Sequence, residues 1–373
     1  MKLTIVAFLI LGTFLQKVQS DDAGKCDTST CLIENNCRCS MLEGPLTLEE
    51  TPQLIVLAFA SAAKEDIYQK IWSPLVMARK NPDGEFISAN FYINHEYSDY
   101  QIVHDLAVNG FEIGVHSVTN TVDQEYWRNA TEELLEQEFG DQRKIMAKFA
   151  NIPADKIRGT LTPQLQLNGD SSTTAFAKQG FTYDNSWPSK THLYPYTLDY
   201  ASGQDCTLGT KCPTQSYPGF WVAPIIDLQG QDGDVCATIF GCFRNSSDQS
   251  VEEISQWFVE QINAVKNDNK APLTLIIEQN LFESVNNSYD ALVDALDTIQ
   301  KSNDVFFVSQ SRVIEWLKNP EPLSTFKTAA DTIETDCVKS FCNLKNEKDE
   351  ERTMISCIPC PKKYPWLGNP EGN

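Results

Sequence analysis

The sequence lacks any excess of positive charge. Its 373 residues include 30 Lys and Arg against 51 Asp and Glu, which gives a formal net charge of −21. So acidic a chain is repelled by nucleic acid and by anionic membrane surfaces, and we therefore expect no nucleic-acid partner and no membrane partner. A neutral partner such as a glycan is compatible with this charge. Solubility alone is the alternative explanation for it.

Long apolar runs are also lacking after the first twenty residues, so no later segment is predicted to cross a membrane. Within those twenty residues, Leu3–Leu15 is an apolar run that follows Lys2 and precedes Val18 and Ser20. This pattern is typical of a cleaved signal peptide. A membrane anchor is the alternative, but the run is short for a span. The pattern predicts a signal peptide over residues 1–20 and a secreted, extracellular protein.

Cysteine, in contrast, is abundant. The twelve cysteines form three groups of four, and an even number in an exported chain indicates disulfides. The C-x-x-C spacing of Cys357 and Cys360 also matches a zinc site, which the secretory context makes the weaker interpretation. The sequence leaves the pairing open. The groups are Cys26, Cys31, Cys37 and Cys39; Cys206, Cys212, Cys236 and Cys242; and Cys337, Cys342, Cys357 and Cys360.

Three Asn-x-Ser/Thr sequons predict surface glycosylation in an exported chain, at Asn129, Asn245 and Asn286. Hydrophobic residues make up 41% of the chain and charged residues 22%, which is typical of a globular protein with a substantial core.

Strand and helix patterns alternate along most of the chain. Leu54–Phe59 is an apolar run typical of a buried strand, and Ile67–Ala78 has a helical pattern. Further strands are expected over Phe86–Ile93 and Phe111–His116, and one long amphipathic helix over Asn129–Ala150. This alternation predicts parallel strands with helices outside, in a barrel-like or doubly wound α/β sheet.

The chain divides by composition. A Cys-rich leader is expected over residues 21–44, one α/β domain over 45–320, and a Cys-rich C-terminal extension over 321–373. The extension lacks a long apolar pattern, so we expect disulfides to hold it together.

The order of several segments resembles that of arthropod chitin deacetylases, which are polysaccharide deacetylases of carbohydrate esterase family 4. The segments are PQLIVLAFASA (52–62), SANFYINHEYSDY (88–100), GFEIGVHSVTN (110–120), RGTLTPQLQLNG (158–169), APLTLIIEQN (271–280) and NDVFFVSQSRVIEWLKNP (303–320). The resemblance covers about residues 26–320. It implies a distorted (β/α) barrel with Cys-rich extensions at both ends.

The resemblance also implies which residues stand at the family's functional positions. Active relatives use a Thr-Phe-Asp-Asp motif, in which the first Asp is the general base and the second binds zinc, and this motif is replaced by Ala58–Ser61. The family's His-x-x-x-His ligand pair corresponds to His116 and Asn120. Its Arg-x-Pro-Tyr motif has become Leu161–Gln164, and its late histidine falls on Glu278.

These replacements remove the base, at Ala60, and leave one good zinc ligand. Catalytic zinc sites need three protein ligands and a water molecule, and neither Ser61 nor Asn120 is a good ligand. No cofactor is therefore expected, in contrast to the zinc of active relatives. His116 is interpreted as a hydrogen-bonded core group. A sharper hypothesis is that Ser61, His116 and Glu278 form a nucleophile, base and orienting acid.

The remaining histidines, His95, His104 and His192, have no partners at ligand spacing and are expected on the surface or in loops. Stacking on sugar rings is a hypothesis for Trp187, Tyr194 and Tyr196, and Trp221 is similar. Ordinary packing is the alternative for all four aromatic residues.

The sequence thus predicts a secreted, catalytically inactive chitin deacetylase-like protein that binds chitin or chito-oligosaccharides through the former active-site cleft. One alternative is an active deacetylase with rearranged ligands, for which Asp99 and His104 are the nearest donors in sequence. Another is a secreted structural or defensive protein that retains only the fold.

Overall fold

The apolar run Leu54–Phe59 forms the central strand. β1 (Gln53–Ser61) is buried over almost its whole length, as its LIVLAF core predicts. It pairs in parallel with three strands: β2 (Asn90–Asn94), β10 (Leu273–Glu278) and β11 (Val305–Phe307). A strand surrounded in this way has no face toward water, which explains its unbroken hydrophobic pattern.

The structure is a computed structural model that describes residues 22–206, 211–244, 248–329, 331–346 and 348–373. The predicted signal peptide and the Asn245 sequon lie outside these ranges. The main sheet has nine strands in the order β10-β1-β2-β3-β4-β5-β7-β6, with β11 beside β1. The other members are β3 (Glu112–Ser117), β4 (Gly159–Thr160), β5 (Tyr183–Ser189), β6 (Tyr196–Leu198) and β7 (Tyr217–Ile226).

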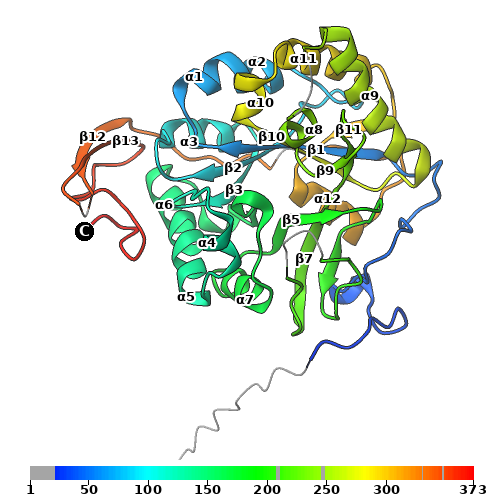
Figure 1. The fold of residues 1–373 in the computed structure, drawn as a ribbon, viewed down its shortest axis with the longest axis horizontal. Coiled ribbons are helices and arrows are strands. Elements are labelled where there is room, and N and C mark those ends of the chain that lie inside the picture. The colour runs from blue at the N-terminus through cyan, green and yellow to red at the C-terminus, as the bar shows by residue number, and fades with distance from the viewer. Residues whose placement is uncertain (1–21, 207–210, 245–247, 330, 347) are drawn as a thin grey trace, which may run out of the picture.

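The sheet curls until β7 contacts β10, so the predicted α/β fold with a distorted barrel is confirmed. Helices cover the outside of the sheet, with α9 and α11 side by side and α5 beside α7 (Figure 1). The helices are α1 (Glu65–Ile67), α2 (Ser73–Val76), α3 (Tyr100–Val108), α4 (Gln124–Arg128), α5 (Glu132–Leu135), α6 (Gln142–Phe149), α7 (Asp170–Lys178), α8 (Ile239–Phe243), α9 (Val251–Asp268), α10 (Gln279–Ser284), α11 (Ser288–Ile299) and α12 (Gln310–Lys318).

Short elements complete the fold. They are η1 (Ile33–Asn35), η2 (Tyr68–Trp72), η3 (Glu136–Asp141), η4 (Ala154–Lys156), η5 (Pro163–Leu165), β8 (Leu228–Gln229), β9 (Val235–Cys236), β12 (Ser340–Lys345) and β13 (Glu351–Ser356). None of the helices in the described ranges is long and apolar enough to cross a bilayer.

Two predicted elements need correction. The helix expected over 129–150 begins only at Glu132, because the Thr131 side chain accepts a hydrogen bond from the Leu134 amide and caps it. From there α5, η3 and α6 run on as one helical segment with a wider turn in the middle. The strand expected from Phe86 begins at Asn90, where pairing with β3 starts.

A buried polar network crosses the interior of the curled sheet. The Tyr183 hydroxyl donates to the Glu112 carboxylate at 2.8 Å, and the backbone amide and hydroxyl of Ser311 donate to the same group. Burial raises the pKa of Glu112, and these three donors oppose the rise. The tyrosine ring lies so close to Gly159 that a side chain there would collide with it. The network therefore joins β3, β5 and the start of α12.

All twelve cysteines form disulfides, as predicted, and every pair lies within one of the three groups. The pairs are Cys26–Cys39, Cys31–Cys37, Cys206–Cys212, Cys236–Cys242, Cys337–Cys357 and Cys342–Cys360. The leader covers the edge of the sheet, where the Arg38 carbonyl accepts from the Thr197 amide of β6. An edge strand covered in this way is protected from pairing with other chains.

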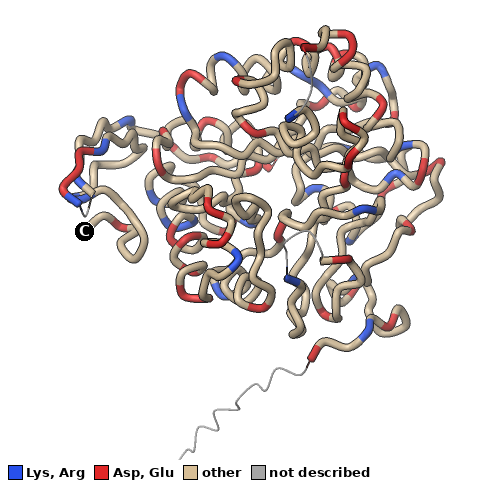
Figure 2. The backbone as a smooth tube through the Cα atoms, viewed as in Figure 1, with Lys and Arg blue, Asp and Glu red and all other residues tan. Residues whose placement is uncertain are grey.

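The C-terminal extension contains an antiparallel hairpin, β12–β13, which lies beside α3 (Figure 1). Cys342, Leu344, Met354 and Tyr364 join the main hydrophobic core, so the extension packs as part of the same body. Acidic and basic positions are interspersed over the fold, the hairpin included (Figure 2).

Two of the histidines expected on the surface or in loops are buried: His95, which does lie in a loop, and His104, which lies in a helix. Docking of the extension covers His95, whose ring nitrogens lie 2.5 Å from the Tyr100 hydroxyl and 2.8 Å from the Pro365 carbonyl oxygen. This burial lowers the pKa of His95 to about 3. His104 lies on the inner face of α3 and contacts the Ala150 carbonyl. His192 is half-buried and forms an ion pair with Asp268.

Replacing Cys342 and Cys360 together by alanine tests whether the extension folds with the core. This pair has a sequence separation of 18, and the chain-entropy estimate gives a loss of about 3 kcal/mol in the free energy of unfolding. For the Cys236–Cys242 pair, with a separation of 6, the expected loss is about 1 kcal/mol smaller. Urea unfolding followed by tryptophan fluorescence measures both. No loss for the first pair would contradict a shared core.

Candidate functional site

Parallel strands collect side chains at their carboxyl ends, and here the ends of β1, β3 and β10 meet around one cleft. Its volume is about 580 Å³. We call it the strand-end cleft. It brings together all six positions that the sequence singled out: Ala60, Ser61, His116, Asn120, Leu161 and Glu278.

Strand register places these residues beside one another. Ala60 and Glu278 are direct partners across the β1–β10 ladder. The Leu161 amide donates to the Val115 carbonyl at 3.0 Å, which sets Leu161 beside His116. The positions come from segments distant in sequence, and parallel pairing alone makes them neighbours.

His116 is held in its neutral form. Its Nδ1–H donates to the Leu161 carbonyl at 2.7 Å, which leaves Nε2 as the acceptor nitrogen. Burial lowers the pKa of His116 to about 4, and the hydrogen bond to Leu161 only partly opposes this. The imidazole is therefore uncharged near neutral pH, in the form that binds metals.

Ser61, His116 and Glu278 share the cleft, but no hydrogen bond joins any two of them within the described ranges. The Ser61 hydroxyl donates to the Gln279 side-chain oxygen at 3.1 Å. His116 is oriented by a backbone carbonyl, and Glu278 is not its partner. Burial raises the pKa of Glu278, and the Thr238 hydroxyl opposes the rise. The described hydrogen bonds therefore do not link a nucleophile, a base and an acid here, and the role predicted for these three residues stays a hypothesis.

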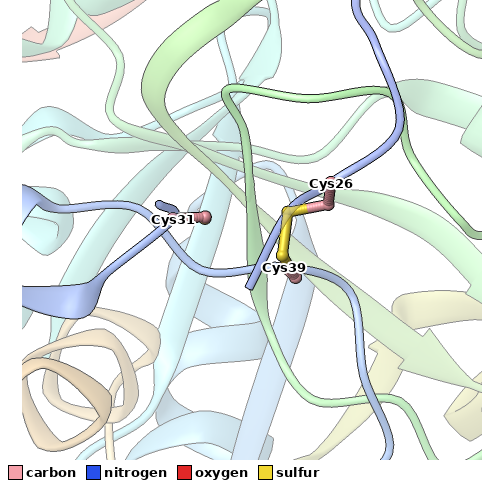
Figure 3. Close-up of side chains that lie close together, drawn as sticks. All are labelled: Cys26, Cys31 and Cys39. Carbon is pink, nitrogen blue, oxygen red and sulfur yellow. A yellow bond between two sulfur atoms is a disulfide. The ribbon is translucent and has the colours of Figure 1, made fainter. Parts of the chain in front are cut away.

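The cleft residues do not fit zinc. His116, Glu278 and Glu283 line the cleft, but their ligand atoms do not converge, and Ser61, Asn120 and Ala60 supply no strong ligand. In the described part of the chain, the one group of three His, Cys, Asp or Glu residues with converging ligand atoms is Cys26, Cys31 and Cys39. Figure 3 shows the Cys26–Cys39 disulfide with Cys31 beside it. Sulfur atoms in disulfides are not thiolate ligands.

The two donors considered for a rearranged metal site lie elsewhere. Asp99 caps α3, where its carboxylate accepts from the Gln101 amide at 2.8 Å. His104 is buried on that helix. Neither residue lines the strand-end cleft.

The aromatic residues considered for sugar stacking are all buried, and this hypothesis is wrong for the present structure. Their polar atoms have internal partners: the Trp187 indole donates to Asp184 at 2.6 Å, and the Tyr194 hydroxyl donates to the Asn269 carbonyl at 2.7 Å. Tyr196 contacts Ser202, and Trp221 donates to Asn36. The alternative of ordinary packing holds for Trp187, Tyr194, Tyr196 and Trp221.

Sequence reasoning missed an aromatic residue that does line the cleft. Phe240 lies on α8 and is half-buried at the cleft wall, with Arg244 of the same segment nearby. Its neighbours Cys236 and Cys242 form a disulfide that fixes this short segment. In the sequence, Phe240 stands between two cysteines that are six residues apart, and this spacing could have indicated an aromatic residue on a fixed segment.

Four residues around the cleft have left-handed backbone conformations without being glycine: Ser117, Asn120, Gln164 and Leu165. Asparagine adopts this conformation readily, but glutamine and leucine do so rarely. Such residues each cost on the order of 1–3 kcal/mol and gather at functional sites. The fold therefore maintains a strained rim around the cleft.

A buried acid lies close behind the cleft wall. Asp184 of β5 accepts hydrogen bonds from Thr160, Ser186 and Trp187, at 2.8, 2.7 and 2.6 Å. Among the described hydrogen bonds and ion pairs, none links it to a cation. Burial raises its pKa to about 6, against the pull of these donors.

Comparison with known proteins finds relatives of this chain. No family model matches the chain. It is 33% identical to chitin deacetylase 8 of Bombyx mori over all of this chain and 99% of the relative. It is 28% identical to chitin deacetylase 1 of Bombyx mori over 94% of this chain and 69% of that protein. A family 4 carbohydrate esterase from Streptomyces lividans has 11% identity and a TM-score of 0.40, covering 68% of this chain and 91% of that one.

A curled parallel sheet with a cleft at its strand ends is the arrangement that the sequence resemblance to polysaccharide deacetylases implies. Within that class, the chain belongs to the chitin deacetylase family, as full-length identity to a curated member shows. Its six disulfides are typical of proteins in oxidising, extracellular compartments.

The pH dependence of stability tests the buried acid. The Asp184 carboxyl has a pKa of 3.8 before burial and about 6 after folding, so the unfolded chain loses this proton first as the pH rises. The charge at Asp184 therefore reduces stability above about pH 4, and the full reduction is reached above about pH 6. In Asp184→Asn this titration is absent.

As the pH falls from about 7 to about 4.5, wild type should gain roughly 2 kcal/mol in free energy of unfolding relative to Asp184→Asn. Urea unfolding at both pH values measures the difference. A gap between the two proteins that does not change with pH would show that the Asp184 carboxyl is not perturbed.

Proposed function

We propose that this protein is a catalytically silent chitin deacetylase homologue that binds chitin or chito-oligosaccharides through the strand-end cleft and is secreted after removal of its signal peptide. The observation that carries the proposal is a cleft with a polar lining in which the positions of the family's base and two ligands hold Ala60, Ser61 and Asn120. Similarity to chitin deacetylases supports a polysaccharide as the partner.

Hydrolysis of an acetamide needs an activated water molecule and stabilisation of the developing oxyanion. Ala60 carries no group that accepts a proton. Glu278, its partner across the ladder, is a carboxylate with no histidine bonded to it among the described contacts. A catalytic zinc ion needs three converging protein ligands, and His116 does not form such a group with Glu278 and Glu283. These replacements support binding without turnover.

The lining of the cleft favours a neutral sugar. Four amide side chains lie there, from Asn120, Gln164, Gln279 and Asn280, and each offers both donors and acceptors. Sugar hydroxyl and acetamido groups need this combination. Phe240 supplies an apolar surface, and the volume is within the range of ligand pockets.

Two of the sequons support a secreted glycoprotein. Asn129 and Asn286 are exposed, so an enzyme that transfers glycans can reach their side chains. Glycosylation of these residues, and of Asn245, stays a prediction.

Restoring metal ligands tests the proposal that this protein is catalytically inactive because it lacks them. The double variant Ser61→Asp with Asn120→His adds a carboxylate and an imidazole at the two positions assigned to ligands, while neutral His116 is already present. We expect about one zinc ion per chain in this variant and well below stoichiometric zinc in wild type, measured by elemental analysis after gel filtration. Stoichiometric zinc in wild type, together with acetate release from chitin oligomers, would overturn the proposal.

Removing the cleft aromatic residue tests ligand binding. Phe240→Ala should weaken binding of a chitin disaccharide by about ten-fold, the upper end of what one aromatic contact contributes. Isothermal titration calorimetry measures the change. Phe86→Ala is the matched control, because Phe86 is exposed and lies outside the cleft. Equal affinities of all three proteins would place the ligand elsewhere.

A further inference from the structure

Tyr97 is an aromatic side chain in an unusual position. It follows β2 and is 69% exposed, in contrast to the buried rings of Tyr92 and Tyr100. Its backbone has φ of 69°, in the left-handed region that a bulky residue rarely adopts. A strained residue that holds a ring in solvent, where burial offers it no stabilisation, suggests a use for that ring.

The segment around Tyr97 is held firmly. The Ser98 hydroxyl donates to the Asn94 carbonyl at 2.6 Å and accepts from the Ala63 amide at 3.0 Å. The Asp99 amide donates to the Ala63 carbonyl at 2.8 Å, and the His95 amide donates to the Ser117 carbonyl at 3.2 Å. The ring is therefore carried by a backbone fixed to the ends of β1 and β3.

Tyr97 borders two grooves. One, of about 390 Å³, has Lys64 and Ser98 on one side and Met354 and Ile355 of the C-terminal extension on the other. The second, of about 820 Å³, lies between Tyr97 and the residues of the β12–β13 hairpin. An ion pair from Arg352 to Glu96, with Nε and Oε1 3.0 Å apart, fixes the hairpin against the Tyr97 segment.

The first groove adjoins the strand-end cleft. Lys64 lines the groove, and its Nζ lies 3.4 Å from the side-chain oxygen of Gln279. The same oxygen accepts from Ser61, and both Gln279 and Ser61 line the cleft. Lys64 therefore lines the groove and contacts a residue that lines the cleft. Lys64 and Gln279 thus lie between the cleft and the groove that Tyr97 borders, and Tyr97 also borders the groove at the hairpin.

The charges along these grooves are of both signs, and some of them are paired. Arg352 contacts Glu96 and Glu350, and Lys345 contacts Asp349. Such a surface has no strong preference for an anion or a cation. A linear neutral polymer with flat apolar ring faces fits an exposed aromatic ring beside polar walls.

We propose that these two grooves extend the binding site, so that a chitin-like chain seated in the strand-end cleft continues past Lys64 and stacks a sugar ring on Tyr97. The C-terminal extension then has a role in binding, because its hairpin forms one wall of the path. This inference rests on the proposed function, since it needs a chain seated in the cleft.

Ligand length separates the two proposals. Calorimetric titration with a chitin disaccharide and a chitin hexasaccharide compares wild type, Tyr97→Ala, Tyr97→Phe and Phe240→Ala. We expect wild type to bind the hexasaccharide more tightly. Tyr97→Ala should weaken hexasaccharide binding by about ten-fold and leave the disaccharide unchanged, and Tyr97→Phe should bind like wild type. Phe240→Ala should weaken both ligands.

Circular dichroism and thermal unfolding check that each variant is folded, and Tyr97→Phe keeps the test valid where alanine destabilises the segment. Unchanged hexasaccharide affinity in Tyr97→Ala, with wild type binding both ligands, overturns the extended path and leaves the proposed function standing. Equal weakening of both ligands by Tyr97→Ala overturns it as well. Absence of binding by wild type to either ligand overturns both proposals.

Discussion

The fold depends on the burial of one strand. β1 pairs with β2, β10 and β11 in parallel, so its main-chain groups are satisfied on both edges while its side chains fill the core. It also ends at the cleft, because its last two residues are Ala60 and Ser61. A strand so constrained cannot change register without exposing its hydrophobic side chains. The position of the cleft is therefore fixed by the same packing that stabilises the domain.

Packing of this kind does not require the catalytic groups of the family. Ala60 and Leu161 are small or apolar, and neither needs a partner when it is covered. His116 is satisfied by the Leu161 carbonyl, and Ser61 by Gln279. Asp184, in contrast to these satisfied groups, reduces the stability of the fold at neutral pH, because it is a buried acid with no cation among its described partners. It remains tolerable since three donors share its carboxylate. The cleft can thus lose water-activating groups while the fold stays intact.

Much of this arrangement was predictable from sequence, because periodicity and parallel strand order determine it. The run at Leu54–Phe59 gave β1, and the even cysteine count gave the disulfides. Contacts between distant segments were not predictable. His95 is buried only because the extension docks over it, with Pro365 as its partner 270 residues away. Tyr194 and Tyr196 are in a stretch that is polar in sequence, yet the leader and the sheet edge cover them.

The same limit explains why sugar stacking was predicted for Trp187 and not for Phe240 or Tyr97. An aromatic residue is far more often packed than exposed, and sequence gives no direct measure of which it is. Trp187 is an indole bonded to a buried acid, so its ring serves stability. Tyr97 is exposed on a strained backbone that several hydrogen bonds hold in place. Burial stabilises the Trp187 ring without any ligand, whereas the exposed Tyr97 ring gains almost no stabilisation from burial. An exposed ring on a backbone held in this way is accessible to a ligand, as a buried ring is not.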